Sequence, residues 1–275
     1  MPLLDANGVR LNYSVSGTGP AVLLLQGAGV VAEGWRPQID VLHKQFTVIA
    51  PDNRGFGGST RGSGPLTIGT MAADALALVD ALRIDAFHLA GHSMGGLIAQ
   101  QIALQQPARV LSLALMCTFA HGGQAASMSL PMLMTAIRMR VGTRAMRRRA
   151  FMQLVMPETY LAEVDQTALA EKLRPLFGYD LASQPSFVMQ QVRAMSRFDV
   201  RPRLSELSRL PAIVVSATED RIAKPEYGRE LDDLIGTSRY VEIRNAGHGV
   251  TIQCADRLNE LLLAHFDASQ AGAPR

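Results

Sequence analysis

Residues 91–95 read Gly91-His92-Ser93-Met94-Gly95 and join two stretches of different character. The apolar run 86–90 precedes them, and a pattern with helical periodicity follows over 94–105. A serine at such a sharp strand-to-helix turn has a strained backbone, and side chains two residues before and after it would collide. Glycine at both positions avoids the collision, and the turn raises the hydroxyl above the sheet. The stretch therefore predicts a nucleophile elbow with Ser93 as the nucleophile, beside the N–H of Met94 as an oxyanion donor.

Apolar runs and helical patterns alternate on both sides of this turn. An unbroken apolar run of strand length, typical of a strand covered on both faces, occurs at 21–25, and similar strand-like runs occur at 46–50, 110–117 and 212–215. Helical periods lie between them at 35–44 and 67–82. This alternation predicts a parallel sheet with helices on both sides. Residues 10–16 instead alternate polar and apolar side chains, which predicts an antiparallel edge strand.

The alternation stops near His121 and resumes near Pro211. Within this interval, 129–149 and 160–176 have helical character, and no strand pattern is convincing. Afterwards the pattern returns as a helix at 225–234, a strand at 239–243 and a helix at 255–266. We therefore predict a core formed by 1–120 and 206–275, interrupted by a helical cap at 121–205.

Composition excludes several classes of protein. The chain has 275 residues, 48% of them hydrophobic, which is enough for a sizeable core. No export signal is visible at the N-terminus, and no apolar run approaches the roughly 20 residues that cross a bilayer. The two cysteines, Cys117 and Cys254, have no paired spacing, so neither a disulfide framework nor a zinc site is indicated. We expect a cytoplasmic protein without metal or cofactor, and the modest net charge of +3 does not imply nucleic acid.

Acidic residues and histidines follow two of the later predicted strands, where ligands gather in open parallel sheets. Residues 216–221 contain Glu219 and Asp220, and residues 244–249 contain His248. A serine hydrolase needs a neutral histidine to take the serine proton and a carboxylate to orient that histidine. The order Ser93, Asp220, His248 supplies these groups, with Glu219 as the alternative acid. The other histidines are weaker candidates, and His92 is expected to point away from the nucleophile.

Together these motifs resemble the α/β-hydrolase fold superfamily, in its cap-bearing branch of serine esterases, lactonases and haloperoxidase-like enzymes. The resemblance covers about 1–120 and 206–270, and it rests on five motifs in register: 26–29, 52–59, the elbow, the Asp220 loop before Pro225, and the Gly247-His248 turn. It implies a mostly parallel eight-stranded sheet flanked by helices, with the cap inserted after the sixth strand.

The resemblance also implies roles for particular residues. It favours Asp220 over Glu219, because the family places its acid at this offset before the proline. Some relatives carry the acid after the sixth strand, where this chain has Cys117-Thr118-Phe119 and no carboxylate. The N–H of Ala28 would join that of Met94 in the oxyanion hole. Gln26 replaces the histidine common in the family, and the loop 52–59 is expected to be structural.

We expect hydrolysis of carboxylic esters with small, apolar acyl groups through an acyl-enzyme on Ser93. Hydrolysis of enol-lactones, thioesters or carbon-carbon bonds is the alternative, and a hydrolase-like ligand receptor with little turnover is a further one. Seven of the 13 methionines lie between Met128 and Met156, and those that face the cleft would form an adaptable apolar wall. The expected partner is a small-molecule ester or lactone; substrate-binding residues and oligomeric state stay open.

Overall fold

The computed structural model describes residues 2–125 and 130–271, in which eight strands form one sheet. Their spatial order is β1-β2-β4-β3-β5-β6-β7-β8. The strands are β1 (Leu3–Ala6), β2 (Val9–Ser16), β3 (Ala21–Leu25), β4 (Thr47–Pro51), β5 (Phe87–His92), β6 (Val110–Met116), β7 (Ala212–Ala217) and β8 (Arg239–Ile243). From β4 to β8 every neighbouring pair is parallel. The predicted fold, a mostly parallel eight-stranded sheet flanked by helices, is confirmed.

The prediction of an edge strand at 10–16 is wrong in one respect. β2 pairs antiparallel with β4, as expected, but β1 pairs antiparallel with its other side. The short stretch Leu3–Ala6 therefore forms the edge. This strand has only four residues, which is too short for a periodic pattern in the sequence to indicate it.

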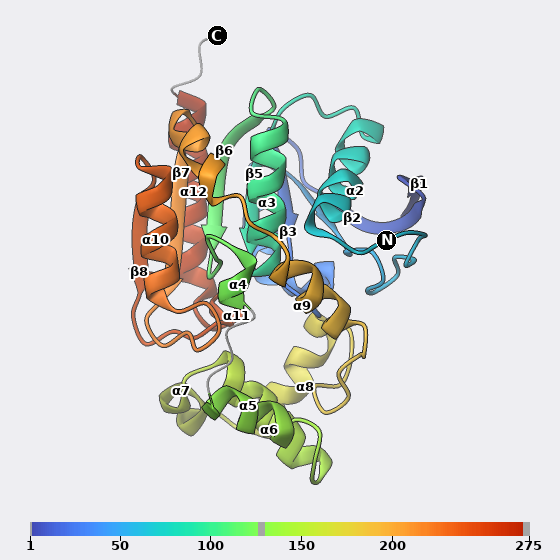
Figure 1. Cartoon of the computed structure of the whole chain (residues 1–275), viewed down its shortest axis with the longest axis vertical. Helices are drawn as coiled ribbons and strands as arrows, with labels where there is room; N and C mark the ends of the chain where they lie inside the picture. The colour runs from blue at the N-terminus through green and yellow to red at the C-terminus, as the bar shows by residue number, and fades with distance from the viewer. Residues whose placement is uncertain (1, 126–129, 272–275) are drawn as a thin grey trace.

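Helices cover both faces of the sheet, as Figure 1 shows. On one face, α2 (Ile68–Ala81), α3 (Met94–Gln105), η2 (Arg201–Arg209) and α10 (Pro225–Ile235) contact one another in succession. On the other face lie α1 (Arg36–Leu42), which follows η1 (Ala32–Trp35), and then α11 (Val250–Gln253) and α12 (Ala255–Ala271). Because both faces are covered, β3, β5 and β7 are buried along their whole length. The carboxyl ends of these strands meet at one edge, where the predicted site residues lie.

The segment between β6 and β7, which we call the cap segment (121–205), contains helices and no strand among its described residues. Figure 1 shows α5–α8 below the sheet. The helices are α4 (Gly122–Ala125), α5 (Leu130–Arg138), α6 (Arg144–Val155), α7 (Glu158–Glu163), α8 (Gln166–Phe177) and α9 (Val188–Ser196). Each predicted helical stretch is divided in two: Gly142, with φ +97°, lies between α5 and α6, and Asp165 caps the N-terminus of α8.

The cap segment has a small apolar core of its own. Side chains from α6, α7 and α8 form this cluster, which includes Phe151, Met152, Leu161 and Leu173. It is separate from the large cluster between the sheet and its flanking helices. α5 contributes no buried residue to either cluster.

Candidate active site

The nucleophile elbow has the strained geometry that its sequence predicts. Ser93 lies between β5 and α3 with φ +54° and ψ −119°, a conformation that side-chain-bearing residues rarely adopt. A Cβ on Gly91 would lie 2.2 Å from the carbonyl oxygen of Gly95, and one on Gly95 would lie 2.0 Å from that of Leu25. Neither position accepts a larger residue, because the obstacle is backbone in each case. The two glycines thus permit the turn.

Hydrogen bonds from β6 and the residues after it hold the strained turn in place. The N–H of Ser93 donates to the carbonyl of Met116 at 2.9 Å, and the hydroxyl of Thr118 donates to the carbonyl of Ser93 at 2.7 Å. Thr118 is buried and also occupies the space beside Gly96, where a Cβ would lie 2.4 Å from its hydroxyl oxygen. Thr118 is therefore a supporting residue that the sequence did not identify, because no local motif marks it.

His248 and Asp220 form a buried pair. The Nδ1–H of His248 donates to Oδ2 of Asp220 at 2.7 Å, and both residues are less than a tenth exposed. The other carboxylate oxygen accepts the backbone N–H groups of Ile222 and Ala223 at 2.7 and 2.8 Å. This bonding leaves Nε2 of His248 to face the pocket that Ser93 also lines. No hydrogen bond joins the side chains of Ser93 and His248, a looseness common in unliganded hydrolases.

The neighbours of Asp220 distinguish it from the alternative acid. Glu219 is exposed and forms no hydrogen bond or ion pair with His248, although its N–H donates to the carbonyl of Ala246. Cys117, in the position after β6 where some relatives carry the acid, is buried. Burial and the Asp220 carboxylate raise the pKa of the Cys117 thiol well above its ordinary value, so the thiol stays protonated.

The loop after β3 leaves the backbone N–H of Ala28 unpaired within the described part of the chain. The N–H of Gly27 donates to Oε1 of Gln26 at 2.9 Å, and the N–H of Gly29 donates to Oε1 of Gln191 at 2.8 Å. Between them, the N–H of Ala28 has no acceptor among the described residues, and Ala28 lines the pocket. Met94, the first residue of α3, likewise has no acceptor for its N–H within its helix. Two unused donors thus flank the nucleophile, as an oxyanion hole requires.

These groups meet at an apolar pocket of about 470 Å³. Its floor consists of Ser93, His248 and the Ala28 loop, and its walls come from α5, α6 and α9. Of the seven methionines between Met128 and Met156, Met132 and Met139 line the pocket, whereas Met152 and Met156 pack inside the cap segment. Met134 and Met146 are exposed, and Met128 lies outside the described residues.

A family model described as the alpha/beta hydrolase fold matches residues 20–253. The chain belongs to the α/β-hydrolase family. It is 30% identical over 267 residues to a protein of Azorhizobium caulinodans named as a carbamate hydrolase, RutD, covering 96% of this chain and 97% of that one. It is also 30% identical over 273 residues to 2-hydroxy-6-oxo-6-phenylhexa-2,4-dienoate hydrolase of Comamonas testosteroni, covering 94% and 92%. The solved enol-lactonase of Burkholderia xenovorans LB400 superposes with a TM-score of 0.81 at 28% identity, covering 97% and 100%.

These three relatives are named for the cleavage of different bonds, but each of the three names describes a hydrolase. The chain is therefore a hydrolase of this fold. No described helix combines the length and apolar character needed to cross a membrane. Over 2–125 and 130–271, no group of three or more metal-ligating side chains comes together.

His92 of this hydrolase lies against the loop of His248. We expected its side chain to point away from Ser93, yet it lines the pocket, and its ring centroid is 4.9 Å from that of His248. Burial, together with the neighbouring His248, lowers the pKa of His92 to about 3, so the ring is neutral. Its Nε2–H donates to the backbone carbonyl of His248 at 2.9 Å. His92 thus fixes the loop that carries His248.

The loop 52–59 is structural, as predicted. Asp52 accepts the N–H groups of Ala32 and Gly58 at 2.7 and 2.9 Å, and Arg54 pairs with Asp74 through two hydrogen bonds of 2.5 Å. Arg54 and Asp74 are both buried. These bonds anchor the loop: the Asp52 carboxylate is held by neutral N–H donors, and the charge of Arg54 is paired with that of Asp74.

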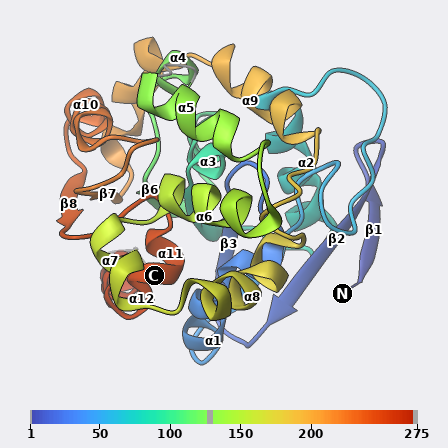
Figure 2. The ribbon, with the colours of Figure 1, turned by 90° about the horizontal axis from the view of Figure 1, so that it is seen from below.

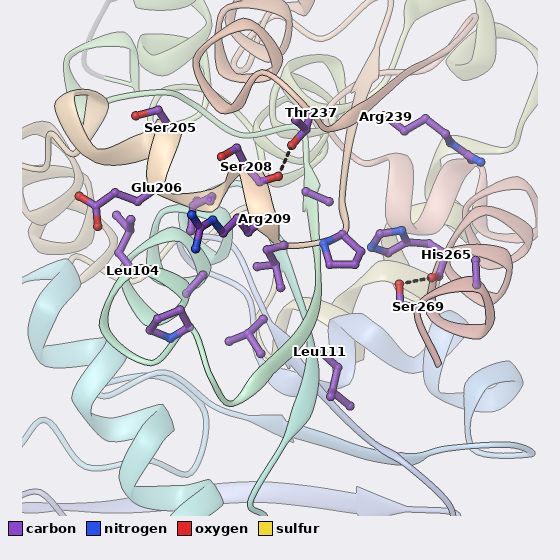
Figure 3. A pocket seen from close by; sticks show the side chains of 18 residues that line it. Leu104, Leu111, Ser205, Glu206, Ser208, Arg209, Thr237, Arg239, His265 and Ser269 are labelled. Atoms are coloured by element: carbon purple, nitrogen blue, oxygen red, sulfur yellow. Dashed lines mark hydrogen bonds between the residues drawn. The ribbon is translucent and has the colours of Figure 1, made fainter. Parts of the chain in front are cut away.

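A larger, more open concavity of about 1170 Å³ lies at the opposite end of the sheet. Figure 3 shows it, with Thr237 donating to the carbonyl of Ser208 and Ser269 donating to that of His265. It is lined by the first residues of β6, β7 and β8, and by none of Ser93, Asp220 or His248. Parallel sheets place their chemistry at the carboxyl ends of strands, so size does not make this concavity the active site.

Proposed function

We propose that this hydrolase cleaves carboxylic esters through an acyl-enzyme on Ser93, with His248 as the base and Asp220 as its partner. The observation that carries the proposal is the convergence of the strained serine and the buried His248–Asp220 pair on one apolar pocket. We also propose that 121–205 acts as a cap over this pocket.

The reaction begins when Ser93 Oγ attacks the ester carbonyl and His248 Nε2 takes its proton. Asp220 stabilises the imidazolium that forms and holds Nδ1 protonated, so that Nε2 is the basic nitrogen. The tetrahedral oxyanion accepts hydrogen bonds from the N–H groups of Ala28 and Met94. His248 then gives the proton to the leaving alcohol, and the acyl group remains on Ser93.

Deacylation repeats these steps with water. His248 removes a proton from the water molecule, the resulting hydroxide attacks the acyl carbonyl, and the same two N–H groups hold the oxyanion. Ser93 leaves with the proton from His248, which restores the resting enzyme. No redox partner or metal enters this balance.

The pocket lining favours a small substrate with an apolar acyl group. Its walls include Met132, Met139, Phe151, Leu154 and Val192, and its volume of about 470 Å³ is in the lower part of the range for small-molecule sites. Because thioether side chains adapt to different shapes, we expect the pocket to accept several acyl groups rather than a single one.

One observation favours a second candidate, the hydrolysis of a lactone that bears a carboxylate. Arg193 on α9 is the only lysine, arginine, aspartate or glutamate among the residues that line the pocket, and no described acidic side chain forms an ion pair with it. A guanidinium at the rim of an apolar pocket can bind a carboxylate on the substrate. Enol-lactonase is also the name of a structural relative.

A p-nitrophenyl ester series of increasing acyl length, together with a lactone series, tests the proposal. We expect rapid turnover of short esters by the wild type and a loss of about 10⁴-fold or more in Ser93→Ala. Arg193→Met should impair only carboxylate-bearing substrates if the second candidate holds. Equal rates for the wild type and Ser93→Ala would contradict the catalytic proposal and favour the ligand-receptor alternative.

The cysteines support a cytoplasmic location. Neither Cys117 nor Cys254 forms a disulfide, and Cys117 is buried as a protonated thiol. Such thiols are usual in reducing compartments. Alkylation of intact cells followed by mass measurement would test this, because a cytoplasmic protein keeps both thiols reduced.

A further inference from the structure

The outer face of α5 is a continuous row of exposed apolar side chains. Leu130, Leu133, Met134 and Ile137 follow the i, i+3, i+4, i+7 spacing of one helix face, and they are 72%, 46%, 46% and 48% exposed. Val141, 64% exposed, continues the row past the end of the helix. We call these five residues the outer stripe.

The inner face of the same helix is also apolar. Met132 and Ala136, together with Met139 directly after the helix, line the catalytic pocket. A surface helix of a globular protein normally has one apolar face, toward the core, and a polar face toward water. α5 has two, and packing within the described chain accounts only for the inner one. The outer stripe is therefore a surface suited to contact with something outside the molecule.

The sequence around the outer stripe is strongly basic. Residues 121–157 contain six arginines and no aspartate or glutamate. Figure 2, which views the molecule from the side of the cap segment, shows α5 and α6 side by side, and the two helices are in contact. Asp180 pairs with Arg144 and Arg148, and Glu171 also pairs with Arg148.

Most of this positive charge is not neutralised. Arg138, Arg140 and Arg149 are exposed, and none of them forms an ion pair with an acidic side chain of the described chain. Arg138 lies on α5 itself and Arg140 directly follows it, so cationic groups border the apolar outer stripe. An amphipathic helix with apolar and basic groups in this arrangement matches the boundary between lipid headgroups and acyl chains.

We propose that the outer stripe and its bordering arginines dock this hydrolase onto an anionic phospholipid surface. The apolar side chains enter the headgroup boundary, and the arginines pair with lipid phosphates. A second copy of this chain fits the surface less well, because a two-fold interface would bring the same unpaired arginines together. Since the inner face of α5 lines the pocket, docking places the active site beside lipid-dissolved esters; this substrate class rests on the proposed ester hydrolysis.

Vesicle co-sedimentation of the full chain tests the docking without turnover, using Ser93→Ala beside the wild type. We expect both proteins to bind phosphatidylglycerol vesicles at least about tenfold more tightly than phosphatidylcholine vesicles, with binding weakened by added salt. Equal binding to the two lipids, or no binding to either, would overturn the proposal. A wild type that binds the vesicles but hydrolyses no ester would instead count against the proposed function alone.

Two variants separate the apolar and ionic contributions. Leu133→Ser/Ile137→Ser and Arg138→Gln/Arg140→Gln should each weaken binding to anionic vesicles by about tenfold or more. Val15→Ser, at an exposed valine on β2 away from the cap segment, is the matched control and should bind like the wild type. Because Leu133 and Ile137 do not line the pocket, unchanged hydrolysis of a water-soluble short ester will show that the variant is folded.

The oligomeric state without lipid distinguishes lipid docking from association between copies of this chain. We expect the wild type and Leu133→Ser/Ile137→Ser to have the same mass in solution by light scattering. A wild-type dimer that this variant dissociates would show that the outer stripe is an interface between copies, and it would overturn the proposal of lipid docking.

Discussion

The catalytic loops and α5 border the same pocket but are held in opposite ways. Ser93, Asp220 and His248 are each less than a tenth exposed, and backbone or side-chain hydrogen bonds of 2.7 to 2.9 Å fix their loops. None of the residues of α5 is buried. The chemical groups are thus preorganised by the core, whereas the α5 wall of the pocket is attached by few packed side chains. Substitutions in the two regions should therefore differ in both size and kind.

Among substitutions that leave Ser93 in place, the largest effect is expected at the acid of the buried pair. Asp220→Asn should lower kcat/KM by about 10³- to 10⁴-fold, because the amide cannot hold the reactive tautomer of His248 or stabilise its imidazolium. Steady-state hydrolysis of a short p-nitrophenyl ester measures this. Glu219→Gln, its exposed neighbour, is the control and should stay within about twofold. The reverse ranking would move the acid to Glu219.

The next effect tests whether the cap segment reaches the catalytic loops through α9. Gln191→Leu should lower kcat about tenfold with little change in KM, because the N–H of Gly29 loses its acceptor and the neighbouring Ala28 donor loses its orientation. Gln190→Leu removes the same side-chain type from the exposed face of the helix and should leave both constants unchanged. If the two variants behave alike, Gln191 does not position the oxyanion loop.

Low pH should reduce the unfolding free energy, because buried histidines are neutral in the folded protein. Burial lowers the pKa of His88 to about 4, so the folded protein keeps this ring neutral while the unfolded chain binds a proton below about pH 6.5. Stability from this group is complete above the unfolded pKa and is lost as the pH falls toward 4. His88→Gln should therefore flatten the pH dependence of the unfolding free energy by about 1 kcal/mol per pH unit.

Urea unfolding of His88→Gln and the wild type at several pH values between about 4.5 and 7 measures this slope. His43→Gln is the control, because His43 is exposed and lies outside the cap segment. An identical slope in the wild type and His88→Gln would contradict a neutral His88 in the folded state.

The smallest effect is expected on the outer stripe. Ile137→Ser should change the unfolding free energy by less than about 0.5 kcal/mol and leave short-ester hydrolysis within about twofold, because its side chain is already in water. Leu173→Ala, in the apolar cluster of the cap segment, should cost about 2 to 5 kcal/mol and is the contrast. Thermal and urea unfolding measure the stability of the two variants. A large decrease in the unfolding free energy of Ile137→Ser would mean that α5 is more tightly packed than its exposure indicates.

Prediction from sequence succeeded where a residue's role is set by nearby residues. The helix predicted at 94–105 has those bounds as α3, and the strand at 21–25 has those bounds as β3. The elbow follows from steric contacts between residues a few positions apart, and unbroken apolar runs indicate buried parallel strands. The geometry of Asp220 and His248 supports their predicted pairing, because strand ends in a parallel sheet meet at one edge.

Prediction failed where the role depends on contacts distant in sequence. α9 was not predicted, although it supplies Gln191 to a loop 162 positions earlier in the chain. Thr118 and His92 each serve the site through hydrogen bonds to backbone carbonyls, and no spacing rule marks such bonds. The break between α5 and α6 was also not predicted, because apolar residues and arginines continue the helical pattern across it.

Trapping of the acyl-enzyme tests the central claim most directly. The protein would be mixed with p-nitrophenyl acetate, quenched in acid during turnover, digested and analysed by tandem mass spectrometry. We predict one acetyl group on the peptide that contains Ser93, and its absence from Ser93→Ala. An acetyl group on another residue, or turnover of the ester by Ser93→Ala at the wild-type rate, would contradict the assignment of Ser93 as the nucleophile.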